Sequence, residues 1–301
     1  MDVRALLMGL AFAAMWSSAF TSARIIVADA PPMAALSIRF LISGLLAVGI
    51  AAALGQTWRL TRSQARATIL FGICQNALYL GLNFIAMQSI EASLAAIIAS
   101  TMPLLVALAT WLAFGERLPL LGVAGLAAGF AGVALIMGTR LQGGTDVGAV
   151  MLCILGVLAL TFATLAVRGA ASGGNVLMIV GLQMLVGSAA LLVPALLFET
   201  WEVTPSWTLA AAFVYTTLIP GLAATLVWFL LVGRIGATRA ATFHFLNPFF
   251  GVAIAALILG EAMGWTDVAG VLVITVGILA VQLARQAPAD RAVSDRVPEV
   301  K

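Results

Sequence analysis

The chain contains very little charge. Only 9% of its 301 residues are Asp, Glu, Lys or Arg, whereas 63% are hydrophobic and the mean hydropathy is +1.13. A soluble domain of this length carries about 25% charged residues, so the composition excludes an ordinary water-soluble protein. In lipid every backbone polar group needs an internal partner, and the apolar runs here are continuous rather than alternating. The sequence therefore predicts an all-α polytopic membrane protein.

Lysine, histidine and cysteine are also scarce. The only lysine is Lys301, so no glycine-rich loop is followed by the lysine that an ATP-binding phosphate loop requires. Cys74 and Cys153 each lie inside an apolar run, which predicts free, buried thiols. One histidine and carboxylates at helix ends supply neither a nucleophile–base pair nor a set of metal ligands. We therefore expect no catalytic residue, no metal site and no cofactor.

The sequence pI is about 9.4, but the basic residues do not form a patch. They stand singly between apolar runs, as arginines that flank membrane spans do. This pattern predicts contact with the lipid bilayer and gives no reason to expect a nucleic-acid partner.

Charged or turn-rich breaks divide the chain into ten apolar segments, each long enough to cross a bilayer. The predicted spans are residues 5–27, 33–54, 67–88, 92–114, 119–139, 147–168, 175–198, 207–232, 239–259 and 265–285. The first span ends near an Ala-Asp-Ala sequence that resembles a signal-peptide cleavage site. We expect it to be retained as a helix, because the internal repeat requires it.

The two halves of the chain repeat each other. At a shift of 145 residues, Pro103 falls on Pro248 and the Gly-Glu pair at 115–116 falls on the pair at 260–261. The order of such matches indicates an internal duplication. We predict one five-helix repeat over residues 1–143, a second over 144–285, and a disordered cytoplasmic tail over 286–301.

Five spans per half force the second repeat to enter the membrane from the opposite side. With the N-terminus inside, the predicted outer loops carry only two basic residues, Arg24 and Arg140. The basic residues predicted to be cytoplasmic are Arg4, Arg59, Arg62, Arg66, Arg117, Arg168, Arg234, Arg239, Arg285, Arg291, Arg296 and Lys301. This bias predicts cytoplasmic termini in a bacterial-type inner membrane. Inverted repeats are characteristic of secondary transporters that bind substrate near the midplane.

Several motifs occur in a recognisable order. They are WSSAF at 16–20, RFLISG at 39–44, SIEASLAAIIASTMPLL at 89–105, FGERL at 114–118 and LGEAM at 259–263. With them, residues 5 to 285 resemble the EamA-type members of the drug/metabolite transporter superfamily, and among these the YddG-type exporters of aromatic and other neutral amino acids. The resemblance implies a ten-helix basket of inverted repeats with a central cavity among the first, third, fourth, sixth, eighth and ninth spans.

A polar stripe marks the third span. Asn76, Tyr79 and Asn83 recur at i, i+3 and i+7, which places them on one face of a regular helix. Such a stripe avoids lipid and either joins neighbouring helices or lines a cavity. The equivalent positions of the second repeat carry different residues, and the residue equivalent to Asn83 is Trp228. We predict a substrate-lining face here, with interhelical bonding as the alternative.

The ninth span carries the only histidine, His244, with Asn247 three residues later. Their counterparts in the first repeat are Ala99 and Met102, so the duplicated scaffold does not explain them. We predict that His244, Asn247 and Met102 contribute to the substrate site. The alternatives for His244 are a bond to a neighbouring helix or transfer of a coupling proton. Pro248 matches Pro103 and predicts a kink.

On the first span, Trp16 and Ser17 lie near the middle, where tryptophan has no membrane interface to occupy. They pack inside the protein or line the cavity, and we include both in the predicted site.

Two kinds of charged residue have competing interpretations. Arg39, about two turns into the second span, either holds neighbouring helices or contacts substrate. Glu116 and Glu261 lie on opposite membrane faces in the predicted topology, which argues against joint acid–base chemistry. Each precedes a new span, where a carboxylate stabilises the positive end of a helix.

The sequence therefore predicts an exporter of small neutral or zwitterionic metabolites, most simply aromatic or other apolar amino acids, that works by alternating access. A proton-coupled drug or metabolite antiporter is the main alternative, followed by a channel, a non-transporting scaffold or an intramembrane enzyme. The expected partners are a small-molecule substrate and the bilayer. A monomer is favoured, although the glycines of the fifth and tenth spans also suit a dimer contact.

Overall fold

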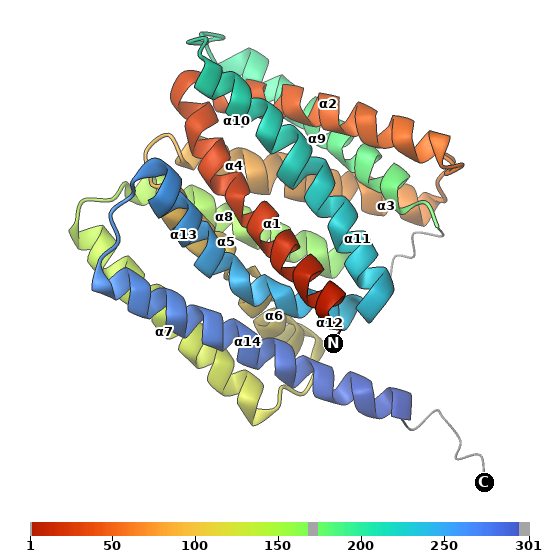
Figure 1. Ribbon diagram of the computed structural model, residues 1–301, viewed down its shortest axis with the longest axis vertical. Helices are drawn as coiled ribbons and strands as arrows, with labels where there is room; N and C mark the ends of the chain where they lie inside the picture. Colours follow the sequence, from red (N-terminus) through yellow and green to blue (C-terminus); the bar gives the residue numbers. More distant parts are fainter. Residues whose placement is uncertain (1, 168–173, 295–301) are drawn as a thin grey trace.

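The computed structural model describes residues 2–167 and 174–294, and its helices are arranged as a basket (Figure 1). The elements are α1 (Val3–Asp29), α2 (Pro32–Ala53), α3 (Arg62–Phe71), η1 (Gly72–Tyr79), α4 (Leu80–Ala86), α5 (Ala92–Ala99), α6 (Met102–Phe114), α7 (Leu120–Gln142), α8 (Val147–Ala166), α9 (Val176–Phe198), α10 (Trp207–Leu218), η2 (Ile219–Ala223), α11 (Ala224–Ile235), α12 (Ala237–Thr242), η3 (Phe243–Leu246), α13 (Asn247–Leu259) and α14 (Trp265–Ser294). Joined end to end, they give ten helical segments long and apolar enough to cross a membrane in this described part of the chain.

The predicted spans agree closely with these segments, and the all-α polytopic architecture is confirmed. The third segment begins at Arg62, five residues before the prediction, because Thr61 and Gln64 form a capping box in a polar stretch that hydropathy does not detect. α14 continues to Ser294, beyond the predicted end at 285, and residues 295–301 of the predicted tail lie outside the described residues. Arg168 also lies outside them.

Two helix pairs form opposite walls of the basket (Figure 1): α2 with α9, and α7 with α14. Both pairs are antiparallel. The start of α2 meets the end of α9, where the carboxylate of Glu199 accepts hydrogen bonds from the backbone N–H groups of Met33 and Ala34 at 2.7 and 2.8 Å. The end of α7 meets the start of α14, where Arg140 pairs with Asp267 at 3.1 Å.

The elements of the two halves begin at matching positions. α6 begins at Met102 and α13 at Asn247, 145 residues later, and α7 and α14 begin at Leu120 and Trp265 with the same offset. The helices before these last two end in glycines of left-handed conformation, Gly115 (φ 65°) and Gly260 (φ 68°). Since equivalent helices such as α2 and α9 are antiparallel, the arrangement supports an inverted duplication.

Four of the spans are irregular near their middles. The third and eighth spans contain π-helical segments, η1 and η2, and the fourth and ninth are interrupted before α6 and α13. Pro103 and Pro248 occupy the first turns of α6 and α13, where a missing N–H costs nothing. The predicted kink is therefore a break, with the proline starting the next helix.

Glu261 caps a different helix from the predicted one. Its carboxylate accepts hydrogen bonds from the backbone N–H groups of Ala92 and Ser93 at 2.7 and 3.0 Å, so it caps α5 of the first half. Asp267 bonds the backbone N–H of Gly264 before α14 instead. The antiparallel packing of the halves brings the end of α13 beside the start of α5, which sequence order does not reveal.

Candidate functional site

Three chambers meet at Trp16, the middle residue of α1, which lines all of them. The large chamber has a volume of about 420 Å³ and extends between α1, α3, α8, α9 and α11. Two small chambers of about 50 Å³ each adjoin it. One lies against α4 and is called here the upper chamber, and the other lies against the break between α5 and α6. A volume of this size suits a small molecule.

Four rings form an aromatic cluster on one wall of the large chamber: Phe12, Trp16, Trp228 and His244. The ring of Phe12 lies 5.7 Å from Trp16, 4.8 Å from Trp228 and 5.2 Å from His244, measured between centroids. Trp228 and His244 are 5.2 Å apart. α1, α11 and η3 supply these rings, so the cluster joins the two halves and presents an apolar surface to a ligand.

Neutral hydrogen-bonding side chains also line the large chamber, among mostly apolar residues. They are the side chains of Gln75, Asn76, Thr164, Gln183, Thr225 and His244. Asn76 is 4% exposed, and its Nδ2 donates to the backbone carbonyl of Gln183 at 2.9 Å, which ties η1 to α9. Among the described residues that line the three chambers, none is Asp or Glu.

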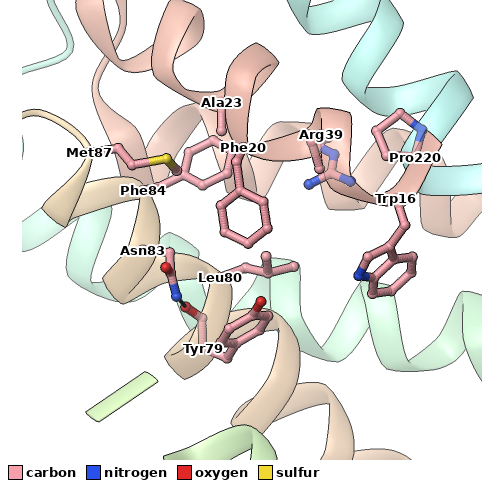
Figure 2. Close-up of a pocket in the computed structure, with 11 residues that line it drawn as sticks. Trp16, Phe20, Ala23, Arg39, Tyr79, Leu80, Asn83, Phe84, Met87 and Pro220 are labelled. Atoms are coloured by element: carbon pink, nitrogen blue, oxygen red, sulfur yellow. Dashed lines mark hydrogen bonds between the residues drawn. The ribbon is translucent and has the colours of Figure 1, made fainter. Parts of the chain in front are cut away.

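Tyr79 and Asn83 lie at the upper chamber (Figure 2). Asn83 donates from Nδ2 to the backbone carbonyl of Tyr79 at 2.7 Å, while its Oδ1 is enclosed and has no partner. Asn76, by contrast, lines the large chamber. The polar stripe of the third span is therefore divided between two chambers, because η1 turns less per residue than the regular helix assumed from the sequence.

The ninth span contributes His244 and Asn247. The imidazole Nδ1 and the amide Nδ2 of Asn247 are 2.9 Å apart, so η3 and α13 hold the two side chains together. His244 lines the large chamber, and His244 and Asn247 both line the small chamber beside Met102. Ser17 lines none of these three chambers, and its Oγ donates to the backbone carbonyl of Asn247 at 3.2 Å.

The structure thus gathers the predicted site residues around Trp16, except Ser17. Sequence reasoning missed Phe12, Leu160, Thr164 and Gln183, which line the large chamber. The cavity implied by the family resemblance left out the second and seventh spans, whereas α2 and α9 both line the large chamber. Gln183 is the counterpart of Arg39 in the second half. Two polar residues at equivalent positions inside spans were the sequence signal that could have pointed to α2 and α9.

The chambers reach one face of the molecule and are closed toward the other. Val167 and Val176, at the end of α8 and the start of α9, line the large chamber on the face where α1 begins, called here the N-terminal face. Toward the opposite face, Ala23 and Met87 are each 1% exposed. Beyond them Arg24 donates to the backbone carbonyls of Met87 and Gln88, which joins α1 to the end of α4.

An ion pair joins the two halves at the N-terminal face. The Asp2 carboxylate caps α1 by accepting from the backbone N–H of Ala5 at 2.9 Å, and it also pairs with Arg234 at the end of α11. Hydrogen bonds from the Arg234 guanidinium and the Ala5 N–H lower the pKa of Asp2 to about 2. The carboxylate is therefore charged at every physiological pH.

No group of three or more metal-ligating side chains occurs within residues 2–167 and 174–294. Chemically, the site offers aromatic faces, amides and hydroxyls for binding a small molecule. Among its lining residues, Arg39 is the one with a permanent charge.

Comparisons with known proteins point to transport. The chain is 29% identical over 283 residues to the Bacillus subtilis (strain 168) uncharacterized transporter YvbV, covering 91% of this chain and 90% of the relative. It is 25% identical to the Synechocystis sp. uncharacterized transporter sll0355, covering 86% and 84%. A crystal structure covers 95% of this chain and 99% of its own with a TM-score of 0.66 at 22% identity, which shows a shared fold.

A family model matches the chain twice, over residues 3–138 and 147–283. The two matches lie on either side of the predicted boundary between the repeats. The chain belongs to the EamA-like transporter family, and it is a multi-pass membrane transporter rather than an enzyme.

Proposed function

We propose that this transporter moves small neutral or zwitterionic metabolites, most simply aromatic or other apolar amino acids, out of the cytoplasm by alternating access. The large chamber supports this proposal, because it combines an aromatic cluster with amide and hydroxyl groups at the junction of the two halves. A strongly anionic substrate needs several cations, and the lining contains one permanently charged side chain. The predicted site residues that line the chambers are proposed to contact substrate.

The direction follows from the proposed topology. The excess of arginine on the N-terminal face supports a cytoplasmic location for that face and for both termini in a bacterial-type inner membrane. The large chamber reaches this face, so the conformation described is ready to load substrate from the cytoplasm. Rocking of the two halves about the site then exposes it to the outside.

Counterflow in proteoliposomes tests the proposal directly. Vesicles containing the purified protein are preloaded with an unlabelled amino acid, and uptake of the same labelled amino acid is followed across a panel. Trans-stimulation for one or more members is expected. Flux without trans-stimulation indicates a channel, and absence of flux for the whole panel contradicts the proposed substrate class.

A substitution at Trp16 tests whether the chambers bind the substrate. Trp16→Ala removes the ring that all three chambers share, about 150–250 Å² of aromatic surface, so we expect flux at subsaturating substrate to fall at least about tenfold. Trp58→Ala is the control, since Trp58 is 73% exposed in the connection between α2 and α3. Unchanged flux in Trp16→Ala, with normal protein abundance, contradicts this assignment.

A further inference from the structure

Arg39 is a buried cation with no hydrogen-bond acceptor and no carboxylate partner within residues 2–167 and 174–294. It lies about two turns into α2, its side chain lines both the upper and the large chamber, and the residue is 5% exposed. Its Nε is enclosed and has no hydrogen-bond partner. The ring of Phe40 lies 5.0 Å from its Cζ. Within the described residues no carboxylate pairs with this guanidinium, unlike Arg140 and Arg234, which both have one.

An unpaired cation in such a place is costly. Burial removes water from the guanidinium, and the face of Phe40 offsets only part of that loss, because a full offset needs an opposite charge or a set of acceptors. If Arg39 served to hold neighbouring helices, its donors would bond the carbonyls or carboxylates of those helices, as Arg24 does with Met87 and Gln88. Within the described part of the chain Arg39 makes no such bond, which leaves its guanidinium free to bind a group from outside the chain.

The space beside the guanidinium is shaped by η2. Pro220 lines both chambers next to Arg39, and a Cβ added to Gly221 would lie 3.5 Å from the Nη2 of Arg39. This is an ordinary van der Waals distance, so Gly221 borders the terminal nitrogens of Arg39 directly. In Figure 2 the guanidinium lies between Phe20 on one side and Trp16 and Pro220 on the other.

We propose that Arg39 binds the carboxylate of the transported molecule, an inference that rests on the proposed function and specifies its substrate class. The planar guanidinium matches a carboxylate in a bidentate geometry. Trp16 borders every chamber, so a ligand held at Arg39 extends its apolar part along the aromatic cluster. No carboxylate in the described lining is available for an ammonium group. Charge recognition therefore lies in the carboxylate, and the class is small amphipathic monocarboxylates, amino acids included.

Thermal stabilisation of the purified protein in detergent tests the anchor without requiring transport. The probes are 3-phenylpropionate, which keeps the carboxylate and the ring, and phenethylamine, which keeps the ring and an ammonium group. The wild type is expected to be stabilised by the acid and not by the amine. Arg39→Gln should weaken the apparent affinity for the acid by roughly tenfold or more, since a charge-assisted hydrogen bond is lost. Arg39→Lys, which retains the charge, should lose less.

Two controls separate binding from a structural role. Arg66→Gln makes the same change at an exposed arginine of α3 and should leave the response to the acid unchanged. Without ligand, Arg39→Gln should melt at or above the wild-type temperature, because an unpaired buried cation has been removed. An arginine that held helices together would instead lower the melting temperature when replaced.

The outcomes distinguish this inference from the proposed function. Equal stabilisation of the wild type and Arg39→Gln by the acid overturns the carboxylate anchor, as does stabilisation by the amine that matches the acid. Absence of acid-dependent stabilisation in the wild type overturns it too. If the amino-acid panel shows no counterflow but the acid still stabilises the wild type in an Arg39-dependent way, the amino-acid substrate fails and the anchor stands.

Discussion

His244 has an environment suited to binding rather than to carrying a proton. Its ring packs in an edge-on geometry against Phe12 and at a tilt against Trp228, and its Nδ1 is bonded to Asn247. A charged imidazolium here would find no carboxylate among the described lining residues. Its Nε2 is the ring nitrogen that the proposed substrate can reach, since Asn247 occupies Nδ1. The residue thus acts as one member of the aromatic cluster with a polar edge.

We therefore predict that transport does not depend on a pH gradient. In the wild type, counterflow of a transported amino acid should have the same rate with and without an imposed gradient, and the same should hold for His244→Gln. The variant should nevertheless bind the amino acid more weakly, because one ring of the aromatic cluster is gone. Stimulation of the wild type by the gradient, abolished in His244→Gln, would instead establish proton coupling through this residue.

Single residues of the site were predictable where they break the rule for a membrane span. A histidine, a mid-span tryptophan and closely spaced asparagines stand out in an apolar run, and Trp16, His244 and Asn76 all line the chambers. Phe12 gave no such signal, since a phenylalanine is ordinary in a span and only the packing of α1 against α11 brings it to Trp228. Arg39 stood out, but sequence could not show whether it had a partner.

At the scale of the helices, the sequence predicted where the spans end but not where they are interrupted. Charged stretches and glycines mark where a span ends, as Gly115 and Gly260 do. In the π-helical segments η1 and η2 the backbone hydrogen bonds shift from i→i−4 to i→i−5. Hydropathy does not reveal this shift. This change divides Asn76 from Tyr79 and Asn83, so the site could be assigned to the third span but not divided between chambers.

The contact between α7 and α14 depends on glycine at close backbone approaches. A Cβ on Gly277 would lie 2.6 Å from the backbone N of Gly129 and 2.7 Å from the carbonyl O of Gly125. These are backbone atoms, so a rotamer change cannot relieve the clash. Small residues at such positions let helices pack closely in lipid.

We predict that Gly277→Ala destabilises the protein by about 1–3 kcal/mol, the usual cost of overpacking. The matched control is Gly138→Ala in α7, where an added Cβ meets nothing within 4 Å. That change should stabilise the helix by roughly 0.5–1 kcal/mol. Thermal or denaturant unfolding of both variants in detergent measures the difference. Equal stability of the two would show that the walls are not fixed at this contact.

For the molecule as a whole, the two faces are closed to different degrees. The large chamber reaches the N-terminal face, whereas the upper chamber is sealed by Ala23, Phe84 and Met87 and by the bonds of Arg24. At the opposite face, the carboxylate of Glu261 caps α5 and Arg140 pairs with Asp267, and both contacts join the two halves. Alternating access requires that this seal open when the large chamber closes.

Thiol labelling from each side of the membrane tests both the topology and this motion. In a background with Cys74 and Cys153 replaced by alanine, Thr164→Cys reports on the large chamber and Ala23→Cys on the sealed one. Trp58→Cys marks the N-terminal face. A membrane-impermeant maleimide should label Thr164→Cys from the same side as Trp58→Cys, and that side should be cytoplasmic. Ala23→Cys should resist labelling from both sides until a transported substrate is added.

With substrate on both sides, Ala23→Cys should become reactive from the side opposite Trp58→Cys, because rocking of the halves opens the seal that Arg24 and Met87 maintain at rest. A channel predicts a different pattern, in which both positions are labelled from both sides at once and substrate has no effect. A rigid scaffold predicts that Ala23→Cys never reacts. Labelling of Thr164→Cys only from the side opposite Trp58→Cys would contradict the orientation of the large chamber, and with it the proposed direction of loading.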